Sequence, residues 1–69
     1  MTPSQKRQIL ILKHYGRAAP EKKGVHFGSM RVLEKQGYVI FNIATRSWSL
    51  TRQGRLYAKR FWPEELEGM

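Results

Sequence analysis

The chain has 69 residues, with 13 lysines and arginines, five acidic residues, no cysteine and a formal net charge of +8. A chain of this length forms one domain and buries only about 60% of the surface that its unfolded form exposes. The lack of cysteine excludes disulfides and thiolate metal sites, and no apolar run approaches the roughly 18 residues of a membrane-spanning helix. We therefore expect a soluble, cytoplasmic protein without a signal peptide.

The positive charge is concentrated in residues 1–62. Three of the five acids lie in the last six residues, so residues 1–62 carry 13 positive and two negative charges, a net charge of +11. Such an excess repels itself unless an anionic partner binds it, and nucleic acid is the commonest such partner. An idle basic surface is the competing interpretation. We expect a single folded domain over residues 1–62 and an acidic, flexible tail over residues 63–69.

The first expected element is a helix over residues 3–15 that supports the core. Thr2 suits the N-cap, Pro3 suits the first helical position, and Gln5 completes a capping box with Thr2. Apolar residues follow at helical spacing, and Gly16 suits the position after the last turn.

The structure of residues 17–25 has two possible interpretations from the sequence. Pro20 suits the start of a single helical turn that Gly24 would end, but so short a segment is also typical of a loop. Lys22 and Lys23 in this segment are either phosphate contacts or solvated loop residues, and the sequence does not decide between these.

A second helix is expected to begin within residues 26–29 and to end at Gly37. Ser29 either caps this helix, or Gly28 and Ser29 lie just inside its first turn. Arg31 and Lys35 are four residues apart and share an exposed face with Ser29 near it. These residues suit a helix in a DNA major groove, where base edges and phosphates are both in reach. An ordinary polar helix face gives the same pattern, so this helix alone does not identify a function.

Two strands follow. Residues 38–42 are mainly β-branched and aromatic, and residues 47–50 alternate polar and apolar, which directs Trp48 and Leu50 to the core. Arg46 lies at the tip of the resulting hairpin. It either reaches a DNA minor groove or keeps the edge of the sheet soluble.

Thr51 is expected to cap a third helix that continues to about Trp62 and ends at Pro63. One face of this helix is apolar and aromatic, which is typical of a core or of a dimer interface. Another face carries a basic row of Arg52, Arg55 and Lys59.

Residues that perform catalysis are not recognisable. The sequence has no glycine-rich phosphate-binding loop, no cluster at metal-ligand spacing and no nucleophile with a partnered histidine. We expect no enzymatic activity, no metal site and no cofactor.

Two stretches resemble the winged helix-turn-helix family. They are Leu33-Glu34-Lys35-Gln36-Gly37 followed by Tyr38-Val39, and Leu50-Thr51-Arg52-Gln53-Gly54-Arg55. In bacterial members of MarR or PadR type, a similar Leu-Glu-x-x-Gly closes the recognition helix, and Leu-Thr-x-x-Gly leads from the second wing strand into the next helix. The resemblance covers about residues 25–60. It implies a small α+β winged helix-turn-helix, with three helices packed on a two-stranded antiparallel hairpin that forms the wing. The chain departs from the family in its short wing and in the helix before the recognition helix, which is reduced to residues 20–23.

The resemblance implies a recognition helix over residues 27–36 and binding of double-stranded DNA, with or without sequence specificity. The protein would be a small transcriptional regulator of phage, prophage or plasmid type, associated with the nucleoid and dimeric through its C-terminal helix. Its contacts would be Ser29, Arg31 and Lys35 in the major groove, Arg46 on the wing, and Lys22, Lys23, Arg52, Arg55 and Lys59 on phosphates.

A winged helix also serves as a protein-interaction module, here an adaptor or inhibitor of a nucleic-acid-processing enzyme. Cations that converge on one face favour DNA, whereas an exposed aromatic patch around Tyr38, Phe41, Phe61 and Trp62 favours a protein partner. RNA or single-strand binding by base stacking ranks below both, because the aromatic residues are needed for the core.

Overall fold

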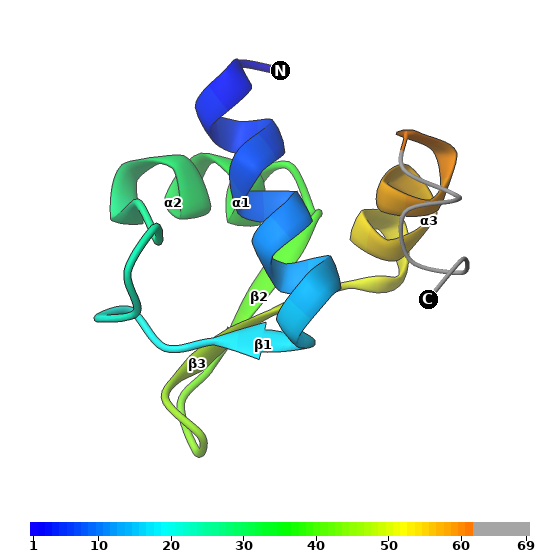
Figure 1. The fold of residues 1–69 in the computed structure, drawn as a ribbon. Coiled ribbons are helices and arrows are strands. Elements are labelled where there is room, and N and C mark those ends of the chain that lie inside the picture. Colours follow the sequence, from blue (N-terminus) through cyan, green and yellow to red (C-terminus); the bar gives the residue numbers. More distant parts are fainter. Residues whose placement is uncertain (62–69) are drawn as a thin grey trace.

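A computed structural model describes residues 1–61 of the chain, and in this part three helices pack with a three-stranded antiparallel sheet (Figure 1). Helix α1 passes between α2 and α3 as seen in Figure 1, and the sheet lies across the lower half of that view. The elements in chain order are α1 (Pro3–Tyr15), β1 (Arg17–Ala18), α2 (Phe27–Lys35), β2 (Val39–Asn42), β3 (Ser47–Leu50) and α3 (Arg52–Phe61).

Helix α1 has the predicted bounds because both of its ends are capped. The Thr2 hydroxyl accepts the Gln5 backbone N–H at 3.2 Å, and the Gln5 side chain accepts the Thr2 N–H at 3.2 Å. At the other end, the Gly16 N–H donates to the Leu12 carbonyl at 2.8 Å with φ at +83°. The capping box and the terminating glycine are therefore confirmed.

The sheet has three strands in the order β1-β3-β2, so the predicted two-stranded hairpin was incomplete. Strand β1 pairs antiparallel with β3, placing Arg17 opposite Ser49 and Ala18 opposite Trp48. Two residues are too few to show strand alternation, which explains why the sequence pattern gave no signal here. The three helices and the hairpin agree with the prediction, and the architecture is consistent with a winged helix.

Residues 20–25 form turns instead of a helical turn. The Lys22 N–H donates to the Ala19 carbonyl at 3.0 Å, and the Val25 N–H donates to the Lys22 carbonyl at 3.1 Å. Gln8 of α1, which is 1% exposed, secures the end of this segment. Its side-chain amide donates to the Gly24 carbonyl at 3.0 Å and accepts the His26 N–H at 3.0 Å.

Helix α2 is capped by His26, so of the two predicted placements of Ser29 the one inside the first turn is confirmed. The imidazole Nδ1 accepts the Ser29 N–H at 3.1 Å, which places Ser29 within the first turn. At the C-terminal end, the Gly37 N–H donates to the Glu34 carbonyl at 3.1 Å and the Tyr38 N–H donates to the Leu33 carbonyl at 2.9 Å. These two bonds, with φ of +88° at Gly37, are a Schellman motif, so the predicted terminating glycine is confirmed.

The two sequence motifs that resemble the winged-helix family meet in space at the start of α3. The Thr51 hydroxyl accepts the Gly54 N–H at 3.1 Å, as predicted for the cap, and donates to the Gly37 carbonyl. The Thr51 N–H also donates to the Tyr38 carbonyl at 3.0 Å. The turn after α2 and the beginning of α3 are therefore held together as one unit. The predicted helix end at residues 62–63 lies outside the described residues.

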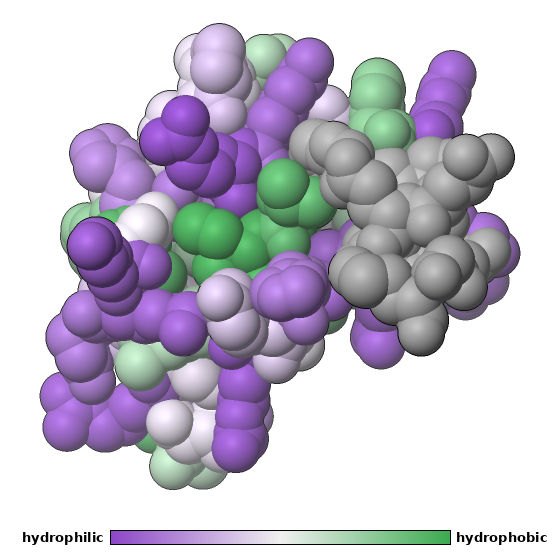
Figure 2. Space-filling model, viewed as in Figure 1, coloured by the Kyte–Doolittle hydropathy of each residue, from purple (hydrophilic) through white to green (hydrophobic). Residues whose placement is uncertain are grey.

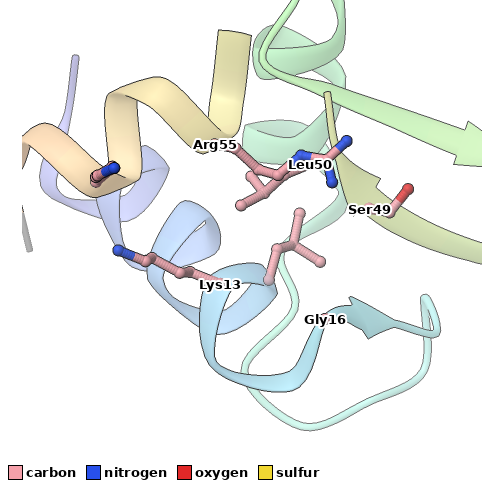
Figure 3. Close-up of a pocket in the computed structure, with 7 residues that line it drawn as sticks. Lys13, Gly16, Ser49, Leu50 and Arg55 are labelled. Carbon is pink, nitrogen blue, oxygen red and sulfur yellow. The ribbon is translucent and has the colours of Figure 1, made fainter. Parts of the chain in front are cut away.

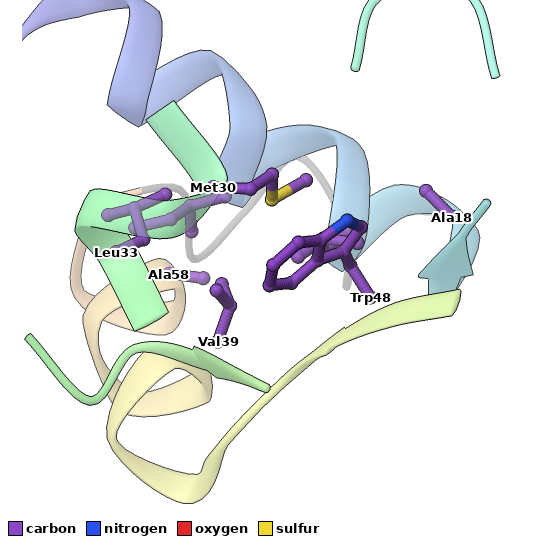
Figure 4. Close-up of a cluster of buried hydrophobic side chains, with 8 residues drawn as sticks. Ala18, Met30, Leu33, Val39, Trp48 and Ala58 are labelled. Atoms are coloured by element: carbon purple, nitrogen blue, oxygen red, sulfur yellow. The ribbon is translucent and has the colours of Figure 1, made fainter. Parts of the chain in front are cut away.

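The core lies where α1 and α2 cover the sheet, and Figure 4 shows Met30 and Leu33 of α2 facing Val39, Trp48 and Ala58. The Trp48 ring, which is 2% exposed, lies 5.0 Å from the Phe41 ring. Its burial was predicted from the strand alternation. The full set of buried apolar side chains is Ile9, Leu12, Ala18, Met30, Leu33, Val39, Trp48 and Ala58.

Candidate nucleic-acid interface

Basic side chains dominate the surface of residues 1–61. Eleven of the 13 lysines and arginines are exposed, while Lys13 and Lys22 are half-buried. Only two carboxylates, Glu21 and Glu34, lie in this part of the chain. Figure 2 shows that hydrophilic residues surround an apolar area over α1 on the face in view.

The outer face of α2 carries the two cations that the sequence assigned to a major groove. Arg31 and Lys35 are both exposed, while Met30 and Leu33 on the opposite face are fully buried. The Arg31 Nε lies 3.6 Å from Glu34 Oε1, and its guanidinium lies 5.7 Å from the centre of the Phe27 ring. These contacts hold Arg31 beside the helix surface, whereas Lys35 extends from the last turn.

Ser29, which the sequence placed near Arg31 and Lys35 as a DNA contact, does not belong to this outer face. Its side chain is buried, and its hydroxyl lies 2.8 Å from the Ser4 hydroxyl and 2.9 Å from His26 Nδ1. The residue therefore ties the first turn of α2 to the first turn of α1. Serine in a first helical turn is equally suited to surface and to internal hydrogen bonds, and the sequence did not separate the two.

The hairpin tip presents Arg46 to solvent. The Asn42 side chain accepts the Ala44 N–H at 2.9 Å and the Thr45 N–H at 3.4 Å, which fixes the turn over residues 43–46. Arg46 has a φ of +52°, a conformation that non-glycine residues adopt mainly in turns. The position that the sequence gave to Arg46 at the tip is confirmed.

The turn before α2 places its two lysines differently. The Lys22 ammonium lies 4.0 Å from the centre of the Tyr15 ring, so this side chain packs on the end of α1. Lys23 is exposed. Lys22 is therefore partly engaged within the protein through a cation–π contact, which sequence spacing did not indicate.

The basic row predicted on α3 is divided by the structure. Arg55 and Lys59 line a cavity of about 470 Å³ together with Lys13, Leu12 and Leu50. Figure 3 shows side chains from α1, β3 and α3 around this cavity. Arg52, in the first turn of α3, does not line it. Lys13 was not among the predicted site residues, because only the folded chain brings the end of α1 next to α3.

A second cavity of about 260 Å³ lies beside the outer face of α2. It is lined by Pro20, by the α2 residues Phe27, Arg31 and Glu34, and by Phe41 and Trp48 of the sheet. Phe27 is 59% exposed, although its ring lies edge-on to the Trp48 ring with the two ring centres 6.3 Å apart. The sequence placed Phe27 only as an apolar residue before the core positions of α2, so this opening was not predicted.

The aromatic residues named as a protein-binding patch are mostly packed. Tyr38 is half-buried with its ring 5.3 Å from that of Tyr57, and Phe41 is half-buried against Trp48. Phe61 is 50% exposed. Trp62 lies outside the described residues. The Tyr57 ring also lies 4.4 Å from the Phe61 ring, so Tyr38, Tyr57 and Phe61 form one series of ring contacts, whereas Phe41 packs on Trp48.

The described residues contain no group of three or more histidine, cysteine or acidic side chains placed to hold a metal ion. None of the three helices over residues 1–61 combines the length and the apolar character needed to cross a membrane. Comparisons of the chain with protein-family models, with curated proteins and with solved structures give no match.

Proposed function

We propose that this protein binds double-stranded DNA through the outer face of α2 and the tip of the hairpin, as a small transcriptional regulator of phage, prophage or plasmid type. In this proposal Arg31 and Lys35 enter the major groove, and Arg46 contacts the minor groove or backbone. Phosphate contacts come from Lys23, Arg52, Arg55 and Lys59, with Lys22 contributing if it leaves the Tyr15 ring.

The observation that carries this proposal is the large excess of lysine and arginine over acidic residues in residues 1–61, where eleven of the cations are exposed. Thirteen cations accompany two carboxylates there, and Glu34 pairs with Arg31. Lysine and arginine that neutralise DNA phosphates release condensed counterions, which is the main source of affinity for nonspecific DNA binding. A polyanion is therefore the partner that best matches this surface.

The support of α2 on both ends agrees with a helix that presents side chains to a partner. Its first turn is tied to α1 through Ser29 and Ser4, and its last turn is fixed by Gly37, whose carbonyl accepts the Thr51 hydroxyl. A rigid frame reduces the conformational entropy lost when Arg31 and Lys35 are ordered on DNA.

The test is a salt titration of binding to mixed-sequence duplex DNA, followed by fluorescence anisotropy. For a protein that contacts DNA phosphates, log K falls linearly with log salt concentration, with a slope of about −0.9 per phosphate contact. The Arg31→Ala/Lys35→Ala variant should lower the size of this slope by about 1 to 2. Arg7→Ala/Arg60→Ala is the matched control, because it removes two exposed cations from α1 and α3.

Comparison of the α2 variant with the control variant distinguishes DNA binding through the outer face of α2 from a general effect of net charge. If the control flattens the slope as much as the α2 variant does, net charge alone explains binding and the assignment to α2 fails. If the wild-type protein binds no duplex at low salt, where electrostatic attraction is strongest, the proposal of DNA binding fails altogether.

A protein partner is the second candidate function, and the opening beside Phe27 favours it. A half-exposed aromatic ring next to a cavity lined by Pro20, Phe41 and Trp48 is suited to receive an apolar side chain from an acidic protein surface. The chain would then act as an adaptor or inhibitor of a nucleic-acid-processing enzyme. Phe27→Ala should abolish capture of such an enzyme while leaving the salt slope on DNA unchanged, and the reverse result contradicts this candidate.

Dimerisation through α3 is proposed from the two large apolar side chains that this helix exposes. Leu56 is 61% exposed and Phe61 is 50% exposed. A symmetric dimer would cover both and would suit a palindromic DNA site. Sedimentation equilibrium with and without DNA should give a dimer that Leu56→Glu converts to a monomer, and a concentration-independent monomer in both conditions would exclude this arrangement.

A further inference from the structure

We infer that the tip of the hairpin formed by β2 and β3 inserts the Ile43 side chain between base pairs from the minor groove and thereby bends the DNA. The inference rests on the proposed function, because it requires a bound duplex, and it adds a second activity, deformation of the DNA. It is carried by Ile43, an apolar residue of the turn over residues 43–46 that electrostatic binding of phosphates leaves without a role.

Ile43 is the most exposed large apolar side chain of residues 1–61. It is 82% exposed, compared with 52% for Ile40 of the same hairpin and 61% for Leu56 of α3. Isoleucine is β-branched and suited to strands, whereas turns favour glycine, proline, asparagine, aspartate and serine. Figure 1 shows that the hairpin projects from the rest of the fold, so its turn can enter a groove ahead of the strands.

The turn that carries Ile43 is held by side chains on both of its arms. The Asn42 side chain accepts the Ala44 N–H at 2.9 Å and the Thr45 N–H at 3.4 Å. The Thr45 hydroxyl lies 2.7 Å from the Ser47 hydroxyl, and Ser47 pairs with Asn42 across the two strands. A turn fixed in this way loses little conformational entropy when it is ordered in a groove.

The same turn combines an apolar side chain with a cation. Arg46 is exposed at the end of the turn that Ile43 begins, and the negative potential of the minor groove attracts arginine. Proteins that bend DNA from the minor groove combine such cations with an apolar wedge that partly unstacks one base step. The cost of unstacking is offset by the additional protein surface that bent DNA contacts, and the bends are about 20–90°. The tip of this hairpin therefore has both parts of such a wedge.

The test uses a duplex of about 20 base pairs, which is nearly straight on its own because the persistence length of DNA is about 150 base pairs. One mismatched pair at its centre lowers the cost of unstacking there and so fixes the position of the wedge. Energy transfer between dyes on the two ends should show a shorter end-to-end distance when wild-type protein saturates the duplex. A 2-aminopurine base beside the mismatch should become brighter, because this base analogue fluoresces more strongly when it is unstacked.

Three variants identify the side chain that is responsible. Ile43→Ser should leave the salt slope unchanged, because it removes no cation, but should abolish the bend and the fluorescence increase. It should also lose the preference for mismatched over matched duplex, which we expect to be about three- to tenfold in the wild-type protein. Ile43→Leu keeps an aliphatic wedge and should retain all three effects. Ile40→Ser is the matched control, because it removes an exposed isoleucine from the same hairpin away from the tip.

Three outcomes would overturn the inference. A duplex that is bound but remains straight and stacked would remove the wedge and leave the proposed function intact. Equal bending by wild-type protein and by Ile43→Ser would show that the bend has another cause. Equal losses from Ile43→Ser and Ile40→Ser would show that the apolar surface of the whole hairpin matters and the tip does not. A failure to bind any duplex overturns the proposed function as well, and the salt titration detects that failure separately.

Discussion

Replacing Gly54 by alanine should destabilise the protein, although the same change stabilises most helices. Alanine is favoured over glycine by about 1 kcal/mol inside a helix. In this chain, however, a Cβ at position 54 would overlap the backbone carbonyl oxygen of Tyr38 and lie 3.0 Å from Leu50 Cδ2. That carbonyl accepts the Thr51 N–H, so it has no freedom to move aside without loss of a hydrogen bond.

The magnitude follows from these contacts. Relief of the overlap requires α3 to shift from the turn at residues 37–38, at a cost of about 1–3 kcal/mol for overpacking and about 1–3 kcal/mol for a weakened buried hydrogen bond. After the helical gain of about 1 kcal/mol is subtracted, Gly54→Ala should lower the free energy of unfolding by about 3 kcal/mol, within a range of about 1–5 kcal/mol. The free energy of unfolding of the whole domain is expected to be only about 3–10 kcal/mol. The melting temperature should fall by about 10–25 °C.

The assay is urea and thermal unfolding followed by circular dichroism at 222 nm. Gln53→Ala is the matched control, since this neighbouring residue is exposed and its truncation should change stability by less than about 0.5 kcal/mol. A Gly54→Ala protein at least as stable as wild type would refute the close approach of α3 to Tyr38 and, with it, this account of why the Leu-Thr-x-x-Gly motif ends in glycine.

Two further substitutions test the hydrogen bonds that join the elements, each measured by the same unfolding assay. Gln8→Leu should lower the free energy of unfolding by about 2–4 kcal/mol, because the Gly24 carbonyl and the His26 N–H lose their side-chain partners. Amide exchange at His26 should also become faster. Unchanged stability would contradict the role of Gln8. Thr51→Val should cost about 1–2 kcal/mol through loss of the α3 cap and of the bond to the Gly37 carbonyl. Thr51→Ser keeps the hydroxyl and should recover most of this loss, whereas a serine variant as unstable as the valine variant would point to packing instead.

The elements that the sequence predicted well are those with local signals. Helix α1 has a capping box and a terminating glycine within its own residues, and β3 alternates polar and apolar side chains, so both were predicted with the bounds that the structure has. Strand β1 has two residues and exists only because Arg17 and Ala18 pair with β3. Its formation depends on a partner some thirty residues later, which no local pattern contains.

The candidate site shows the same limit. Exposed positions of Arg31, Lys35 and Arg46 follow from helical and hairpin geometry and agree with the structure. The burial of Ser29 does not follow from helical geometry, because it depends on a contact with Ser4 of another helix. Likewise, the grouping of Lys13 with Arg55 and Lys59 depends on how α1 and α3 pack, and a linear row of charges on α3 gave no indication of it.

The short first strand has a mechanical consequence for the hairpin. Strand β3 is hydrogen-bonded to β2 on one side and to β1 on the other, so the hairpin of β2 and β3 is also held along one edge by β1. The hairpin can close early from local contacts, but its docking must wait for the long loop between Arg17 and Ser49 to close. Once docked, a force applied at Arg46 is carried along β3 to Trp48 and across to Ala18, both in the core. A force that a binding partner exerts on the tip of the hairpin is therefore transmitted to the core.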